Sequence, residues 1–141
     1  MGIVCHYLDQ TSELMQNITL QQLSFKIIDV TSSTEAFVKE VADCKFILSS
    51  AMHGLICADS LGIPNKHIVL SDNVLGGEYK FRDYYSVFNN FTYRPVYLAN
   101  TSIHDKDIDV FNKEYTIEAS EVEQICRNLL DVAPFQVKNR S

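Results

Sequence analysis

The chain has 141 residues, the size of one ordinary domain, and its 46% hydrophobic and 21% charged residues are values of a globular protein rather than a disordered one. Its net charge of −6 argues against nucleic acid as the main partner, because a phosphate backbone needs clustered lysine and arginine. No apolar run approaches the roughly 20 residues that cross a bilayer, and the N-terminus lacks the pattern of a signal peptide. We therefore expect a cytoplasmic protein with no membrane span and no nucleic-acid partner.

The cysteines are scattered along the chain without a C-x-x-C pair. They are Cys5, Cys44, Cys57 and Cys126. This spacing suits reduced thiols in the cytosol better than a disulfide framework or a zinc site. We expect four unpaired cysteines, no metal and no cofactor.

Short apolar stretches alternate with helical patterns in the first half of the chain. The apolar stretches predict buried strands at Gly2–Tyr7, Phe25–Val30 and Lys45–Ser49. A polar helix or loop is expected over Ser12–Gln22. Ser33 or Thr34 can cap a helix that contains Phe37, Val38 and Val41 at helical spacing. Met52–Leu61 reads as a helix that Gly62 closes and that Pro64 cannot continue.

The second half is predicted in less detail. His67–Leu70 indicates a fourth strand, and Ser71–Asn90 is long enough to be a functional loop with a helix near Arg82–Phe88. Arg94–Leu98 indicates a short strand. Ser120–Leu130 predicts a closing amphipathic helix with a serine cap and Glu123 at the capping-box position.

Strands that alternate with helices imply parallel pairing, right-handed crossovers and helices on both faces of the sheet. The predicted fold is therefore α/β, a doubly wound, mostly parallel sheet in one Rossmann-like domain of residues 1–141. Ligands of such sheets bind at the carboxyl ends of the strands, near a topological switch point. This rule directs attention to Asp29–Ser33, Ser49–His53 and Ser71–Lys80.

The strongest candidate site lies where the third strand meets its helix. Ser49, Ser50 and His53 converge there on the first turn of a helix, whose unpaired N–H groups and dipole bind anions. Gly54 lets a ligand or a neighbouring strand come close. The dipole would favour a neutral His53 acting as donor or general base. The alternative is that Ser50 caps the helix and His53 is a core residue.

The other histidines differ in their expected position. His6 ends the first strand beside Tyr7 and Asp9, on the predicted ligand edge. His67 begins the fourth strand, so we expect it at the opposite, amino edge in a structural role. His104 is expected in a polar loop with two aspartates, at a spacing that matches no metal motif.

Three stretches resemble one family. FILSSAMHGLICADSLGIPN (Phe46–Asn65) and GEYKFRDYYSVF (Gly77–Phe88) resemble the C-terminal half of polysaccharide pyruvyl transferases, and MGIVCHYLDQ resembles the strand and "HY-D" segment that opens that half. The resemblance covers Gly2–Phe88. Members resemble two-domain GT-B glycosyltransferases and move a pyruvyl group from phosphoenolpyruvate onto a sugar hydroxyl as a ketal.

The resemblance implies a function and a set of roles. The chain would be the C-terminal domain of a larger transferase that acts on a sugar or lipid-linked saccharide of a bacterial surface polysaccharide (exopolysaccharide), and it would lack its N-terminal partner domain. His53 would be the general acid/base or a phosphate contact, and Ser49 and Ser50 would hold the donor. His6 and Gly54 belong to the same expected binding site.

The chain departs from the family at Ala51, where many members carry an arginine. The identity of the donor therefore stays open. Lys80 and Arg82 are expected to supply the positive charge as an anion clamp, and the alternative for this pair is an exposed, solvated face.

Two other functions remain open. One alternative is the C-terminal donor-binding domain of a GT-B nucleotide-sugar glycosyltransferase, and the other is a non-catalytic fragment that serves as an interaction module. A half-enzyme would expose apolar side chains where its partner domain belongs, so we expect it to dimerise through that edge, with Lys80 and Arg82 close to His53. The side chains expected to be exposed there are Tyr79, Phe81, Tyr84 and Tyr85.

Overall fold

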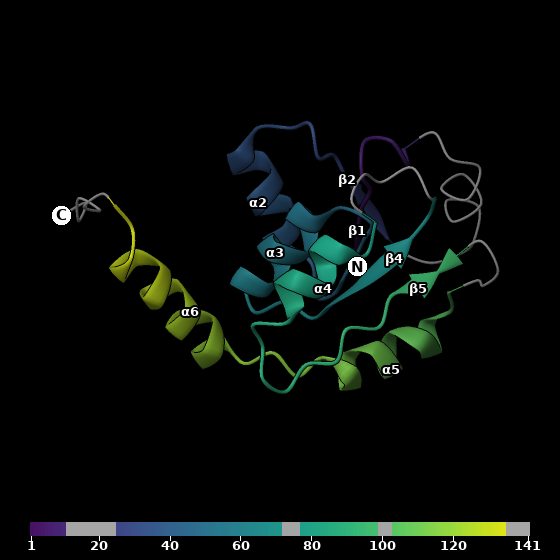
Figure 1. The fold of residues 1–141 in the computed structure, drawn as a ribbon. Coiled ribbons are helices and arrows are strands. Elements are labelled where there is room, and N and C mark those ends of the chain that lie inside the picture. Colours follow the sequence, from purple (N-terminus) through teal and green to yellow (C-terminus); the bar gives the residue numbers. More distant parts are fainter. Residues whose placement is uncertain (11–24, 72–76, 99–102, 135–141) are drawn as a thin grey trace.

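Five parallel strands form the centre of the protein in the order β2-β1-β3-β4-β5 (Figure 1). The computed structural model describes residues 1–10, 25–71, 77–98 and 103–134. The strands are β1 Gly2–Val4, β2 Lys26–Ile28, β3 Ile47–Ser49, β4 Asn65–Val69 and β5 Val96–Tyr97. The helices are α2 Thr34–Ala42, α3 Met52–Ser60, α4 Tyr79–Tyr85, α5 Asp105–Glu114 and α6 Ala119–Asp131. The predicted parallel α/β fold is confirmed, and the expected element at Ser12–Gln22 lies outside the described residues.

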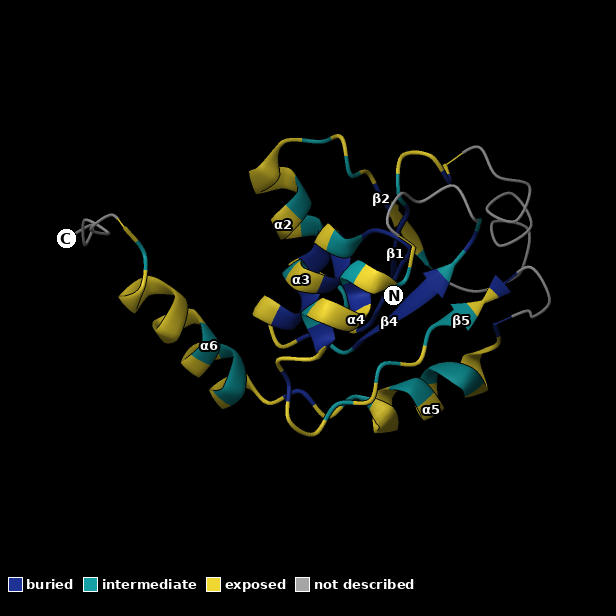
Figure 2. Cartoon of the chain, in the orientation of Figure 1, coloured by how far each residue is buried: buried dark blue, intermediate teal, exposed yellow. Residues whose placement is uncertain are grey.

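Alternate side chains of the strands pack on opposite faces of the sheet. One face is covered by α2 and α3, and its buried strand residues are Val4, Ile28 and Ile47. The other face is covered by α5, and its buried strand residues are Ile3, Leu48 and Ile68. Figure 2 shows these strands as buried elements between exposed helix surfaces. Helices on both faces are the arrangement expected of a doubly wound sheet.

The second strand differs from its prediction. We expected Phe25–Val30 to be buried, but only Ile28 is buried within β2. Because β2 is the outermost strand, Ile27 on the face away from α2 remains 49% exposed. The stretch is apolar enough for a central strand, and only the strand order decides that it lies at the edge.

The starts and ends of α2 and α3 follow the sequence signals. Ser33 caps α2, since its hydroxyl accepts the N–H of Ala36 at 3.3 Å. Helix α3 ends at Ser60, and Gly62 follows with a φ of 66°, a conformation that costs little only for glycine. Both predicted boundaries are confirmed.

A third apolar cluster joins α4 and α6 to α3. Its buried members are Leu55, Phe81, Tyr85, Phe88 and Ile117. Phe81 and Tyr85 are one helical turn apart, so both face α3 and are only 1% and 3% exposed. The expectation of exposed aromatics is therefore wrong for these two, whereas Tyr79 is 79% exposed as expected. Tyr84 is half-buried.

A buried carboxylate anchors this cluster. Asp59, at the end of α3, accepts hydrogen bonds from the hydroxyls of Tyr84 and Tyr115, both at 2.8 Å, and from Nδ2 of Asn65 at 2.6 Å. Burial raises the pKa of Asp59, and the three donors oppose that effect. The network ties α3 to β4, α4 and the segment before α6, so we assign it a structural role.

The C-terminal helices depart from the prediction. His104 is not in a loop but caps α5, and its N–H donates to the carboxylate of Asp107 at 2.8 Å in a capping box. Helix α6 begins at Ala119 and has no side-chain cap, so the expected serine cap at Ser120 is wrong. Figure 1 shows α6 extending away from the sheet.

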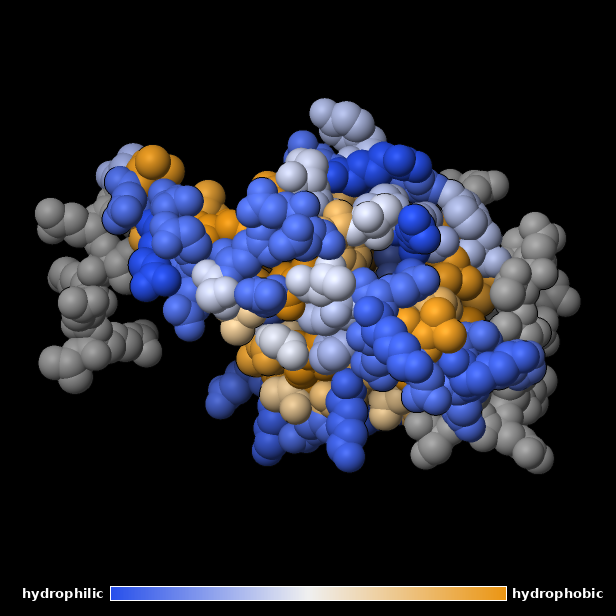
Figure 3. Space-filling model, turned by 90° about the horizontal axis from the view of Figure 1, so that it is seen from below, coloured by the Kyte–Doolittle hydropathy of each residue, from blue (hydrophilic) through white to orange (hydrophobic). Residues whose placement is uncertain are grey.

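Apolar side chains of α6 reach the surface (Figure 3). Val122 and Ile125 pack against the third cluster. Leu129 and Leu130 are 63% and 53% exposed. Dimerisation through an apolar surface stays a prediction.

No disulfide joins the four cysteines, all of which lie in the described stretches, as the sequence predicts. Among the described helices, none is long and apolar enough to cross a membrane.

Candidate functional site

The strand order places the switch point between β1 and β3, whose carboxyl ends lie side by side. The N–H of Ser50 donates to the carbonyl of Val4 at 3.0 Å. The hydroxyl of Ser50 accepts the N–H of His6 at 2.9 Å. His6 thus lies on the predicted ligand edge, and its backbone fixes the Ser50 hydroxyl.

Asp9 is the centre of this edge. The chain turns back after β1, with the N–H of Asp9 donating to the carbonyl of His6 at 2.8 Å. The carboxylate is 0% exposed and accepts the hydroxyls of Ser50 at 2.8 Å and Ser71 at 2.5 Å, one on each oxygen. A buried carboxylate needs such donors to offset its lost hydration. Asp9 therefore joins the ends of β1, β3 and β4.

A pocket of about 260 Å³ opens beside Asp9. Its walls come from the carboxyl end of β4, the start of α4 and β5. The lining residues are Asp9, Ser50, His67, Ile68, Val69, Leu70, Ser71, Gly77, Glu78, Phe81 and Tyr97.

His67 is a wall of this pocket, contrary to its expected place at the amino edge. Strand β4 begins at Asn65, two residues earlier than predicted, so His67 sits mid-strand opposite Ser49. Its ring is 6% exposed and stacks on Phe81 with centroids 3.8 Å apart. Its Nδ1 lies 2.6 Å from the hydroxyl of Tyr93.

The environment of His67 fixes its protonation. Burial, with the positive charge of Lys80 adding to it, lowers the pKa of His67 to about 4. Burial also raises the pKa of Tyr93, with the negative charge of Glu78 adding to it and Arg82 opposing it. At neutral pH the imidazole is therefore neutral, and its tautomer decides whether Nδ1 accepts the proton of the Tyr93 hydroxyl or donates to its oxygen.

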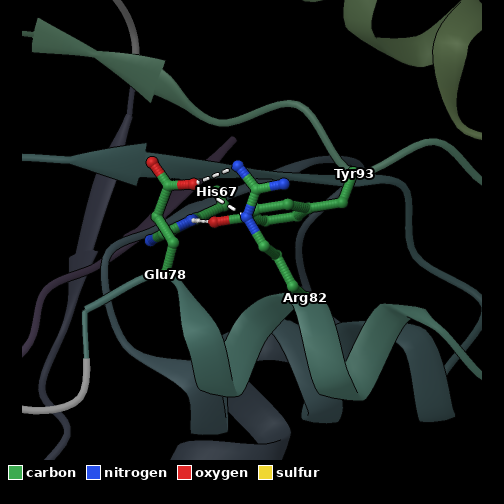
Figure 4. Close-up of polar contacts among 4 residues, drawn as sticks. All are labelled: His67, Glu78, Arg82 and Tyr93. Atoms are coloured by element: carbon green, nitrogen blue, oxygen red, sulfur yellow. Dashed lines mark hydrogen bonds and ion pairs between the residues drawn. The ribbon is translucent and has the colours of Figure 1, made fainter.

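Figure 4 shows Arg82 and Glu78 above this pair. Glu78 accepts Nε and Nη2 of Arg82 at 3.1 and 2.7 Å, and the guanidinium lies 5.7 Å from the Tyr93 ring centroid. Nζ of Lys80 lies 5.2 Å from the ring centroid of Phe81. Arg82 thus has a carboxylate partner beside the pocket, and the expected role of both cations in holding an anion stays a prediction.

His53 has the position that the sequence predicts. It is the second residue of α3, at the carboxyl edge, and it is exposed. The N-cap residue is Ala51, no side chain caps the helix, and its first turn contains no acidic residue. Ser50 directs its hydroxyl to Asp9 instead of the helix, so the alternative of a serine cap and a core histidine is wrong.

Two neighbouring residues hold α3 against the sheet. The buried hydroxyl of Ser49 donates to the carbonyls of Val4 at 3.0 Å and Ala51 at 2.7 Å, and accepts the Ala51 N–H at 3.1 Å. A Cβ on Gly54 would collide with the Ser49 hydroxyl and lie 2.8 Å from the side chain of Val4, so it is the ends of β3 and β1 that come close here. The expected ligand contacts of Ser49 and Gly54 stay predictions.

A second groove begins at His53 and runs between α2 and α3. It has a volume of about 520 Å³ and a mostly apolar lining that includes Phe37, Ile56 and Leu61. Its Val38 and Ile56 side chains are each over a third exposed. Among the described residues, no cluster of three or more His, Cys, Asp or Glu side chains could hold a metal ion.

Sequence reasoning placed Asp9, Ser71 and Glu78 in stretches at the predicted ligand edge but assigned them no role. It missed His67 as a site residue. The "HY-D" segment was a usable signal for Asp9, which stands at its last position. His67 had no such signal, because its place depends on where β4 begins.

Comparison with known proteins identifies the matched part of the chain. The family model described as polysaccharide pyruvyl transferase matches residues 4–72, which contain Asp9, Ser50, His53 and His67. An uncharacterized protein of Acanthamoeba polyphaga mimivirus is 37% identical over 93 residues, which are 62% of this chain and 31% of that protein. The chain thus spans less than a third of the curated relative it matches. No solved structure matches the chain significantly. Over residues 4–72, the chain is similar to the polysaccharide pyruvyl transferase family.

Proposed function

We propose that this chain is the donor-binding part of a pyruvyl transferase that takes the pyruvyl group from phosphoenolpyruvate and passes it to a sugar of a polysaccharide precursor. One observation carries the proposal. The start of α3 has no side-chain cap, lies at the switch point within the matched stretch, and carries the exposed His53 in its first turn. Free N–H groups at a helix start are a site for phosphate or carboxylate.

We assign separate roles to the start of α3, to His53 and to Ser50. The N–H groups of the first turn of α3 hold a phosphate or carboxylate oxygen, and the helix dipole adds to that attraction. The imidazole of His53 contacts the same anion and exchanges a proton with it. The buried Ser50, held by Asp9 and His6, fixes the strand end from which the helix starts.

The chemistry is a ketal transfer. Two sugar hydroxyl oxygens form bonds to carbon 2 of phosphoenolpyruvate, and the bond from that carbon to the phosphate oxygen breaks. One hydroxyl proton ends on the methylene carbon, which becomes a methyl group, and the other leaves with phosphate. We assign to His53 the transfer of one of these protons at the phosphate side.

Ala51 leaves the start of α3 without the cation that many family members carry there. Its side chain is 3% exposed and packs in the cluster of α2 and α3, where an arginine would be buried. The cation that many family members carry at this position therefore has to come from another part of the protein. We propose two sources, Lys80 on the neighbouring α4 and a partner domain of the transferase.

The test is titration of the chain with phosphoenolpyruvate, followed by NMR of the histidine side chains. We expect the His53 signals to shift and His53→Gln to weaken binding about tenfold, the equivalent of one lost charge-assisted hydrogen bond. His104→Asn is the matched control, because His104 caps α5 on the other face of the sheet and asparagine is a good cap. Equal affinity in His53→Gln and the unmodified chain would reject the proposal.

A sugar nucleotide that shifts His53 in place of phosphoenolpyruvate would favour the GT-B glycosyltransferase alternative. Binding of neither would favour an interaction module. Turnover is to be measured as phosphate release on the full-length protein, since the curated relative is about three times as long as the matching region.

A further inference from the structure

His67 lines the pocket beside Asp9 with one ring nitrogen that has no hydrogen-bond partner among the described residues. Its Nδ1 is engaged by Tyr93, so this nitrogen is Nε2. Within the same stretches, every buried side-chain nitrogen or oxygen does have a partner. Nε2 therefore keeps some contact with open space, and the pocket is the space that His67 lines.

In the described part of the chain, the pocket is lined by two carboxylates and otherwise by uncharged residues. Its charged groups among the described residues are the carboxylates of Asp9 and Glu78, and no lysine or arginine lines it. Arg82 already pairs with Glu78, and the ammonium of Lys80, 5.2 Å from the ring centroid of Phe81, is not part of the lining. A phosphate or carboxylate here would meet like charges, whereas an uncharged ligand with hydroxyl groups can both donate to a carboxylate and accept from an imidazole.

The remaining wall suits the apolar face of such a ligand. Phe81 and Tyr97 supply aromatic surface, and Tyr97 is 49% exposed. The volume of about 260 Å³ lies just below the range of about 300–1,000 Å³ that is typical of drug-sized ligands. The pocket thus fits one small ring rather than a nucleotide.

We propose that this pocket binds a neutral polyhydroxyl ligand of monosaccharide size, with His67 Nε2–H donating to one hydroxyl and the Glu78 carboxylate accepting from another. Tyr93 is a positioning residue, because its hydroxyl holds the ring proton on Nε2. The inference rests on the proposed function only for the role of this ligand, which would be the sugar acceptor. The binding itself follows from the lining.

The experiment uses the chain with ¹⁵N-labelled histidine and, as probes, the methyl glycosides of glucose, galactose and mannose. We expect long-range ¹H–¹⁵N spectra to show the Nε2–H form of His67, and at least one glycoside to shift its Nε2 signal at millimolar concentration. Inorganic phosphate should leave that signal in place. His67→Gln should weaken glycoside binding five- to tenfold.

Tyr93→Phe tests the positioning role and keeps the aromatic ring. We expect it to produce a mixture of the two imidazole tautomers and to weaken glycoside binding severalfold. Tyr79→Phe, whose side chain is 79% exposed, is the control with the same chemical change, and it should alter neither. A far-UV spectrum and a melting curve establish that each variant folds.

Three results would overturn the inference. They are an Nδ1–H form in the unmodified chain, a shift of His67 by phosphate rather than by glycosides, and no shift by any glycoside at 100 mM. If phosphoenolpyruvate still shifts His53 in such a case, the proposed function stands and only the pocket assignment is lost. If glycosides shift His67 and phosphoenolpyruvate binds nowhere, the pocket stands and the proposed function is lost.

Discussion

Acidification should destabilise the protein through His67. An unfolded histidine has a pKa of about 6.5, and burial with the nearby charge of Lys80 lowers that of His67 to about 4. Between these two pKa values His67 is protonated in the unfolded chain but neutral in the folded chain. The free energy of unfolding therefore falls as the pH falls. A gap of about 2.5 pH units at about 1.36 kcal/mol each gives about 3 kcal/mol, all of it present above pH 6.5 and lost near pH 4.

The groups that face His67 set this figure. Phe81 excludes water from one side of the ring, and the Tyr93 hydroxyl occupies Nδ1. Lys80 adds a positive charge, whereas Arg82 is balanced by Glu78 at 2.7 Å. No carboxylate is hydrogen-bonded to the imidazole in the described structure, so no such bond stabilises the protonated ring.

Urea unfolding at pH 7 and at pH 4 measures the effect. His67→Gln removes the titrating group and keeps an acceptor for Tyr93, so this variant should lose about 3 kcal/mol less than the unmodified chain between the two pH values. His53→Gln removes an exposed histidine and should retain the full acid loss. The reasoning is refuted if His67→Gln and the unmodified chain lose the same free energy, or if NMR finds the His67 imidazole titrating near pH 6.5.

Three further predictions concern the same edge of the sheet. Gly54→Ala should lower the free energy of unfolding by about 1–3 kcal/mol, because the new Cβ would lie 2.8 Å from Val4, and a chemical denaturation curve with no loss would contradict the close packing. Asp9→Asn should cost about 1–3 kcal/mol in the same assay, since two hydroxyls lose a charged acceptor, and an unchanged midpoint would refute this role. Iodoacetamide at pH 8 should label the exposed Cys126 well before Cys5, whose pKa burial and the Asp9 charge raise to about 12, and mass spectrometry of timed samples will show the order.

Most of the backbone could be predicted because its signals are local. Ser33 before α2 and Gly62 after α3 act within one turn of their own helix. In the structure Ser33 caps the start of α2 and Gly62 follows the end of α3, as the sequence predicts. The start of α5 was not predicted, because it lacks a common local signal. Its cap is His104, a residue type that is not among the common N-caps, so no local signal indicated the helix.

The site could be predicted only for residues that are close together in the sequence. Ser50 and His53 are three positions apart, so the strand-to-helix change was enough to place both at the carboxyl edge. Asp9 and Ser71 join them through hydrogen bonds that span 41 and 62 positions. These contacts depend on the strand order, and a single sequence does not reveal which strands become neighbours.

Ser50 links the two places where we propose that ligands bind. Its backbone leads into the uncapped start of α3, and its hydroxyl donates to Asp9 in the wall of the acidic pocket. A helix start attracts an anion, and carboxylates beside a neutral imidazole accept uncharged hydroxyl groups. The transfer that we propose joins one anion to one such hydroxyl compound, so it needs both environments within a few residues. Because Asp9 accepts the hydroxyls of Ser50 and Ser71 with one oxygen each, it connects the wall of the pocket to the strand end from which α3 starts.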